Sequence, residues 1–412
     1  MGLPNVVFTV TDNGLGRRNP TDDNVGALVM TGVAAGDVTL GDPFMVKSLA
    51  EAEALGITSD YDEDNTVLVW YHIREFFKVN PDGELWFILK SQATTMETLA
   101  DKNTANGLKL LLTTANGRVR FIGVARNPAS GYTPTLANGL DADVVAAVAK
   151  AQEFAEEEFA RKRPVQFLIE GRSLNGTLTS AKDLRTLGAE HVSVVIGQDY
   201  DVADGDALFN GMACVGTTLG MICKAKVNEN IGWPEKFKID YDGVNWQYPA
   251  LSNHVKIEDV KLTDMDALDV LGYIMPRRFT GLAGTYFNDS HTCTVITSDY
   301  AYIENVRTIN KAVREAYAAL VTKLNSPLNV DPLTGKIASE TIKYFEQLVA
   351  SSLDEMGRNG EISVSNGVIG RDVYIDPDQN ILSTSELTVK ISIVPTATGR
   401  SMQVTIGLAT SI

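Results

Sequence analysis

Alternating apolar and polar residues near the C-terminal end predict two half-buried β-strands. The apolar positions of the first strand are Leu387, Val389, Ile391 and Ile393, and those of the second are Met402, Val404, Ile406 and Leu408. A period of two is typical of a strand with one covered face. The outer edge of the second strand has no later strand to cover it, and an open edge can pair with another chain. We therefore expect residues 399–412 to form a strand arm that is shared between chains.

The N-terminal end has a shorter pattern of the same kind. Val6, Phe8 and Val10 fall on one side of a predicted strand over residues 5–11, and the turn-rich sequence DNGLGRRNPTDDN follows it. The first buried strand is expected only at residues 25–33. Residues 1–20 are therefore predicted to form a second, tethered arm.

Between these ends, buried strands alternate with amphipathic helices. Strands are predicted over residues 25–33, 85–90, 119–125, 165–169 and 192–196, and helices over 44–55, 66–79 and 141–163, with shorter helical pieces within 96–113. The alternation is typical of βαβ units. The strands over 165–169 and 192–196 are continuous apolar runs, which indicates a sheet that is covered on both faces. We expect an α/β domain here.

The second half of the chain follows a different order. A loop-rich stretch over residues 231–259 precedes two long predicted helices, 300–324 and 339–356, and a final region that is rich in strands. These boundaries predict four parts: an arm over 1–20, an α/β region over 21–260, a C-terminal domain over 261–398 and an arm over 399–412. The fold class is therefore mixed α/β (α+β).

Composition narrows the classes of function. The chain has 36 basic and 52 acidic residues and a formal charge of -16, so it would repel a nucleic-acid backbone. Three cysteines without a CxxC pair favour reduced thiols made in a cytosol. The N-terminal sequence has no signal-peptide pattern. The longest apolar window, 207–223, contains Gly216 and Gly220 in GxxxG spacing, but at this length we expect a buried segment and no membrane insertion.

The sequence contains no convincing catalytic or metal-binding motif. Carboxylates at Asp60, Asp62 and Asp64 resemble the opening of a calcium loop, but Asn65 stands where the turn requires glycine and Tyr71 where a bidentate glutamate is required. His291, beside Asp289 and Ser290, invites comparison with a catalytic triad, but no nucleophile motif accompanies it. Phosphate-binding glycine loops and HExxH are absent from the sequence. We predict no enzyme activity, no cofactor and no metal.

The order of the segments resembles the contractile tail sheath proteins of bacteriophages and related injection systems. The matching segments are VGALVMTGVA, DPFMVKSLAEAEALG, VWYHIREFFKVNPDGELWFILK, LGYIMPRRFTGLAGTYFNDSHTCTVITSDYAYIENVRTINKAVREA and ELTVKISIVPTATGRSMQVTIGL. The usual PGVYVEE-like opening of that family is replaced by NVVFTVTDNGLG, and residues 127–260 match no segment of the family.

The resemblance implies a subunit that stacks as hexameric rings around an inner tube and contracts to drive the tube through a target envelope. The inner domain would combine the C-terminal half with N-terminal segments, and an outer α/β domain would face outward. The arms would add strands to neighbouring copies through Val6, Phe8, Val10, Met402, Val404, Ile406 and Leu408. Other partners would be the inner tube protein, the baseplate and the tail terminator. The location would be the tail of a virion or injection particle assembled in a bacterial cytoplasm.

One surface and two alternatives remain open. Glu346, Asp354 and Glu355, on the predicted helix 339–356, either face the tube or form an ordinary solvated helix face. The alternatives to a sheath subunit are an α/β nucleotide-binding enzyme, which the βαβ order also fits, and a non-contractile tube or baseplate protein.

Overall fold

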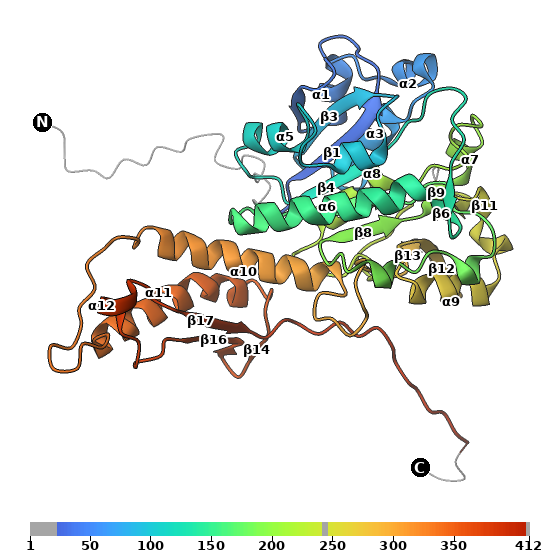
Figure 1. Cartoon of the computed structure of the whole chain (residues 1–412). Helices are drawn as coiled ribbons and strands as arrows, with labels where there is room; N and C mark the ends of the chain where they lie inside the picture. The colour runs from blue at the N-terminus through green and yellow to red at the C-terminus, as the bar shows by residue number, and fades with distance from the viewer. Residues whose placement is uncertain (1–22, 241–245, 409–412) are drawn as a thin grey trace, which may run out of the picture.

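A six-stranded sheet forms the centre of the larger part of the molecule, shown in Figure 1. The computed structural model describes residues 23–240 and 246–408. The order of strands across the sheet is β2 (Pro43–Val46), β3 (Leu85–Ser91), β1 (Gly26–Gly32), β4 (Phe121–Ala125), β7 (Gln166–Glu170) and β8 (Val192–Val195). All neighbours are parallel except β2, which is antiparallel to β3.

Helices cover both faces of this sheet. One face carries α4 (Met96–Ala100), α5 (Leu108–Thr114) and α6 (Ala142–Ala160), and the other carries α3 (Val69–Val79) and α8 (Val215–Lys224). The side chains of β1 point alternately to the two faces. Ala27 and Val29 lie in the core under α4, α5 and α6, while Leu28 and Met30 lie in the core under α3 and α8. Because side chains alternate along a strand, both faces of β1 must be apolar. The expected α/β arrangement is confirmed.

Two glycines allow α8 to lie directly against α3. A Cβ atom at Gly216 would stand 2.1 Å from the carbonyl oxygen of His72, and one at Gly220 would stand 2.7 Å from that of Phe76. The GxxxG spacing in the apolar window thus serves helix packing inside the body, and all of α8 up to Cys223 is buried. None of the described helices is long and apolar enough to cross a membrane.

Smaller elements complete the larger body. Helices α1 (Leu49–Ala54), α2 (Ser59–Asn65) and α7 (Tyr200–Ala203) lie around the sheet, β5 (Leu136–Ala137) pairs with β6 (Leu140–Asp141), and β9 (Gly197–Asp199), β10 (Pro249–Leu251) and β11 (Val255–Lys256) form a second sheet. Helix α9 (Leu262–Val270) precedes a hairpin of β12 (Pro276–Phe279) and β13 (Leu282–Phe287).

A smaller C-terminal body begins with α10 (Ile303–Val321), which runs along the larger body and continues past it in Figure 1. Helix α11 (Ser339–Arg358) packs beside α10 and against the two-stranded sheet of β16 (Arg371–Tyr374) and β17 (Lys390–Ile393). The remaining elements are β14 (Val364–Ser365), β15 (Val368–Ile369) and α12 (Ile381–Thr384). Val349, Leu353 and Met356 of α11 form a core that is separate from those of the large sheet.

Some sequence expectations need correction. Residues 44–46, predicted as the start of a helix, form the edge strand β2, and the helix begins only at Leu49 after the N-cap Ser48. The domain boundary predicted after residue 260 stays a prediction. Core packing groups Leu268 and Tyr273 with the large sheet.

Candidate functional site: the C-terminal arm and its anchor

The chain that follows β17 crosses from the smaller body to the larger one before it leaves both. Val394 donates its N–H to Gly370 at 2.7 Å and accepts from Ser363 at 2.9 Å. The side chain of Asn228, in the larger body, donates to Thr396 Oγ1 at 3.0 Å. Residues 394–400 therefore form an anchored segment, which we call the arm root.

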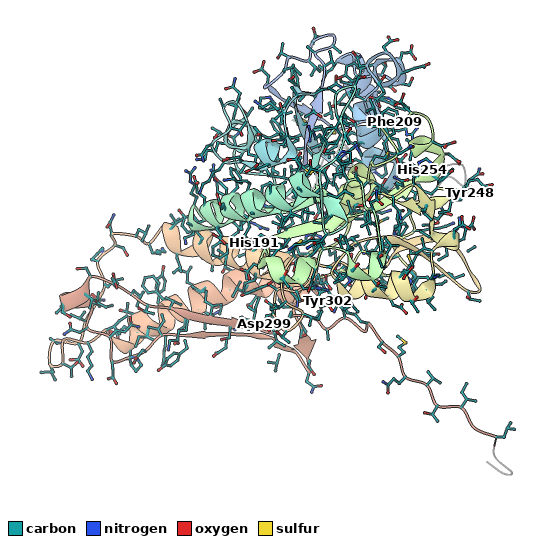
Figure 2. The ribbon with its side chains drawn as sticks, turned by 45° about the vertical axis from the view of Figure 1, so that its right-hand side comes forward. His191, Phe209, Tyr248, His254, Asp299 and Tyr302 are labelled. Atoms are coloured by element: carbon teal, nitrogen blue, oxygen red, sulfur yellow. The ribbon has the colours of Figure 1, made fainter. Side chains whose placement is uncertain are left out.

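Beyond Arg400 the described chain, residues 401–408, is exposed. Met402, Val404, Ile406 and Leu408 are 86%, 78%, 90% and 108% exposed, and no hydrogen bond within the described chain involves residues 401–408. Figure 2 shows this segment running away from the rest of the ribbon with its side chains in open space. The strand predicted here is therefore not formed within the described residues, because no neighbouring strand supplies hydrogen bonds to it.

The anchor is a cluster of buried carboxylates that holds Arg400. Its Nε donates to Asp289 Oδ2 at 2.8 Å, an Nη2–H donates to Glu304 Oε1, and its guanidinium lies 3.3 Å from the ring centre of Tyr302. The side chains of Glu304 and Asp289 are only 2% and 12% exposed. Burial lowers the pKa of Arg400, but the two carboxylates outweigh burial and raise it. The arm root therefore carries a fixed positive charge in a nearly closed acidic site.

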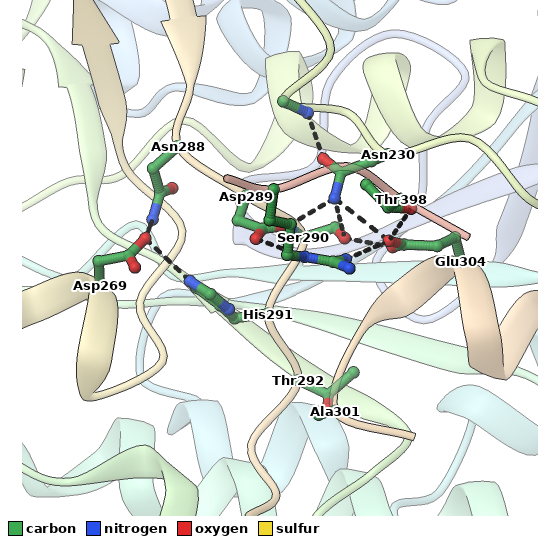
Figure 3. Close-up of polar contacts among 12 residues, drawn as sticks. Asn230, Asp269, Asn288, Asp289, Ser290, His291, Thr292, Ala301, Glu304 and Thr398 are labelled. Atoms are coloured by element: carbon green, nitrogen blue, oxygen red, sulfur yellow. Dashed lines mark hydrogen bonds and ion pairs between the residues drawn. The ribbon is translucent and has the colours of Figure 1, made fainter. Parts of the chain in front are cut away.

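Neighbouring polar groups complete the acidic site, as Figure 3 shows. The amide of Asn230 donates to Asp289, to Ser290 Oγ and to Glu304. The hydroxyl of Ser290 donates to Glu304 Oε2, and that of Thr398 donates to Oε1 at 3.3 Å. These donors supply the hydrogen bonds that buried carboxylates need.

The same close-up shows that the sequence Asp289–Ser290–His291 is not a triad. His291 Nε2 lies 3.0 Å from Asp269 Oδ1, and its Nδ1 faces Arg185 Nη2 at 2.7 Å. Ser290 points to Glu304 instead of to the imidazole. Because the arginine must donate, Nδ1 accepts and Nε2 carries the proton. His291 thus holds structure together and has no nucleophile to activate.

The three acidic residues suggested to face a tube have different environments on α11. Asp354 accepts from Arg371 Nε and Nη2 at 2.8 and 2.6 Å, and Glu346 Oε1 accepts from the N–H of Ile375 at 3.0 Å. Glu355 is exposed. A tube-facing role stays a prediction for all three, and Glu355 is the residue that can test it without disturbing an internal contact.

The other proposed linking residues, Val6, Phe8 and Val10, lie outside the described residues. Sequence reasoning missed the anchor, Arg400 with Asp289 and Glu304, because an apolar pattern cannot reveal a buried ion pair. The available signal was on α10: Glu304, Arg307, Lys311 and Arg314 follow at spacings of three, four and three residues, which places four charges on one helix face.

The position where a doubly wound sheet would bind a nucleotide is filled by side chains of this chain. The parallel strands have the order 2-1-3-4-5, so the switch point lies between β1 and β4. There Asn127 donates to the carbonyl of Thr31 at 2.7 Å and accepts from the N–H of Leu68 at 2.9 Å. The carboxylate of Asp62 accepts from three N–H groups at the start of α3, at 2.8 to 2.9 Å. A carboxylate thus occupies the place that a phosphate would need.

Asp62 is also the central residue of the calcium-like sequence, which lies on the helix α2. Burial raises its pKa to about 7, although the three N–H donors act in the opposite direction. Within residues 23–240 and 246–408, no group of three or more His, Cys, Asp or Glu side chains could hold a metal ion.

Two family models together match nearly the whole chain. Family models described as "DUF2586, N-terminal domain" and "DUF2586, C-terminal domain" match residues 3–291 and 299–412. No curated protein is significantly similar in sequence.

Solved structures with a similar fold include sheath proteins. The helical sheath of the anti-feeding prophage in its contracted state has a TM-score of 0.64 at 12% identity, with 100% of both chains covered. The contracted sheath complex of the extracellular contractile injection system PVC has a TM-score of 0.60 at 12% identity, covering 100% of this chain and 98% of that one. The sheath tail protein of Desulfitobacterium hafniense has a TM-score of 0.51 at 10% identity, with 95% and 100% covered. The fold is therefore that of a contractile-system sheath protein over its full length.

Proposed function

The chain belongs to the DUF2586 family, and from its sheath-type fold and its bare C-terminal arm we propose that it is a structural subunit of a contractile sheath. Copies stack as hexameric rings around an inner tube protein, between a baseplate and a tail terminator. Contraction of this lattice drives the tube through a target envelope. The particle is the tail of a phage or an injection system, assembled in a bacterial cytoplasm.

The observation that carries the proposal is the exposed alternation of Met402, Val404, Ile406 and Leu408. Leaving four large apolar side chains in water costs about 1.5 to 3 kcal/mol each relative to burial. A partner sheet would remove that cost and add main-chain hydrogen bonds of about 1 kcal/mol each. We propose that this arm, and the arm over residues 1–20, add strands to sheets of neighbouring copies.

The small sheet of β16 and β17 is a fitting receiver. Each of these strands pairs only with the other within the described chain, so an outer edge of each remains open. One face of the sheet packs on α11, and Val373 and Ile393 contact the core there. An added strand would extend this half-covered sheet.

A structural subunit needs no nucleotide, and the filled switch point at Asn127 and Asp62 supports this reading over an α/β nucleotide-binding enzyme. The energy for contraction would be stored at assembly as a metastable packing.

A proline scan across residues 402–407 tests strand addition. Proline removes one N–H, and N–H groups along an edge strand face the partner sheet only at alternate residues. We expect sheath formation, seen by electron microscopy of the purified protein, to fail at every second position and to survive at the positions between. Deletion of residues 401–412 should give soluble particles that form no long tubes.

The intermediate positions of the scan are the matched controls. Long tubes from the deletion variant, or equal tolerance of proline at all six positions, would refute strand addition. An unmodified chain that yields no tubes with or without an inner tube protein would refute the sheath function itself.

A further inference from the structure

Helix α10 holds the start of the described chain as well as the end. The carboxylate of Asp23 lies 2.7 Å from Lys311 Nζ and also accepts from Arg314. Arg307 donates to the Asp23 carbonyl and to Asn24 Oδ1, both at 3.3 Å. The side chain of Asp23 is 14% exposed. These contacts fix the point from which residues 1–22 depart.

The C-terminal arm root is fixed on the same helix face. Glu304, which receives Arg400, precedes Arg307, Lys311 and Arg314 on one stripe of α10. An α-helix rises 1.5 Å per residue, so the two roots are held within about three helical turns of one another along one rigid element.

The charges on the stripe make the binding place of each root selective for that root; we call these places the two seats. The first turn offers a carboxylate to an arginine, and the later turns offer ammonium and guanidinium groups to a carboxylate. Placing either root in the other seat would bring like charges together in a buried position, which is strongly unfavourable.

Further contacts tie the stripe to both bodies. Arg307 donates to the carbonyls of Ile222, Ala225 and Lys226 at the end of α8, at 2.9 to 3.1 Å. Lys311 Nζ also lies 2.8 Å from Glu361 Oε1, after α11. A helix held in this way cannot turn independently of either body.

We propose that α10 is a common anchor for both arms, with Asp23 and Arg400 as the positioning residues that set the direction of each arm. The inference rests on the proposed function for its purpose, which is to connect two links between subunits through one stiff element. A displacement imposed on one arm then passes to the other arm and is not absorbed by a loose root.

The test measures arm direction in the full-length monomer by distances between paired spin labels. One pair of labels, at Ser401→Cys and Asp299→Cys, reports where the C-terminal arm leaves its root, and a second pair, at Asn24→Cys and Ala318→Cys, reports the N-terminal root. The three native cysteines are buried, so they should not take up the label. We expect a single narrow distance peak from each pair in the parent chain.

Arg400→Gln should broaden the distance peak of the first pair and leave that of the second pair unchanged. Asp23→Asn should broaden the peak of the second pair and leave that of the first pair unchanged. Arg400→Lys keeps the charge but loses the two-pronged contact and the ring stacking, so its peak should be intermediate. Arg371→Gln, which breaks an ion pair in the smaller body away from both roots, is the matched control and should change neither peak.

Narrow peaks that persist in Arg400→Gln and Asp23→Asn would overturn the anchor. The same result follows if Arg371→Gln broadens the peaks as much. Thermal unfolding of each variant separates a loosened root from a destabilised chain. If the peaks respond as expected but the parent chain forms no tubes, the anchor stands and the sheath function fails.

Discussion

Replacing Gly216 by alanine gives a sharp test of how the larger body is packed. Glycine in a helix interior is ordinarily about 1 kcal/mol less favourable than alanine, so helix propensity alone predicts stabilisation. The added Cβ would, however, stand 2.1 Å from the His72 carbonyl oxygen, a shortfall of 1.3 Å against the 3.4 Å at which ordinary contacts begin. The obstacle is main chain of α3, which no rotamer change can move aside.

The expected net effect is a loss of about 2 kcal/mol or more in the free energy of unfolding. Overpacking in a well-packed core costs about 1 to 3 kcal/mol, occasionally more, and the immovable backbone places Gly216→Ala at the upper end before the propensity gain is subtracted. A Cβ at Gly220 would stand 2.4 Å from Val79 Cγ2, on a side chain that can shift, and 2.7 Å from the Phe76 carbonyl oxygen, so Gly220→Ala should be destabilising but less so.

The assay is urea unfolding followed by tryptophan fluorescence, since the buried Trp246 donates to Glu75 Oε2 on α3 at 3.3 Å. Gly399→Ala is the matched control, because nothing lies within 4 Å of its added Cβ. A midpoint for Gly216→Ala equal to or above that of the parent, at unchanged slope, would show that the two helices are not held in contact as described.

Three further predictions follow from single side chains. Burial lowers the pKa of His72 from 6.5 to about 3. As the pH falls below about 6.5 the unfolded chain therefore binds the proton before the folded chain does, and the free energy of unfolding should fall by about 1.4 kcal/mol per pH unit. His72→Gln should flatten the dependence of the urea midpoint on pH, and an unchanged slope would contradict this. Arg307→Gln should lower the free energy of unfolding by about 3 kcal/mol, because three carbonyls at the end of α8 lose a charged donor; calorimetry measures this loss, and a variant as stable as the parent would refute the role of Arg307. Glu355→Lys should reduce sheath assembly on tubes without changing the melting temperature, whereas Asp354→Lys should also destabilise the fold because it breaks the ion pair with Arg371; unchanged assembly in Glu355→Lys would remove that residue from the tube-facing surface.

Elements whose stability depends on an apolar face could be predicted from the sequence. Strand β1 and helix α6 match their expected ranges closely, because burial on two faces or on one stripe leaves a plain pattern. Strand β2 could not be predicted in the same way. It is four residues long and half exposed, and the helical spacing of α1 extended into it. Only the N-cap Ser48 marks where the helix begins.

The candidate site was predictable in part, and for different reasons. The alternation over residues 402–408 predicted a strand arm. In the structure these residues are exposed and form no strand, and sharing of the arm between copies stays a prediction. The anchor was not predictable, since Arg400 and Asp289 are 111 residues apart and no local pattern relates them. Asp62 shows the opposite error. Its acidic sequence resembled a metal loop, but the structure uses the carboxylate to cap α3.

The six-stranded sheet and the two-stranded sheet of β16 and β17 differ in how their outer edges are covered. Beside β8, Ile274 exchanges main-chain hydrogen bonds with Val194 and Ile196, and Cys293 donates to Val192. At the opposite margin stands the brief β2, which begins with a proline. A strand from another chain would therefore find few free main-chain hydrogen-bonding groups at either edge of the large sheet. If copies join by the strand addition proposed above, the sheet of β16 and β17 offers an open edge for it, and the larger body could vary without breaking the connections between copies.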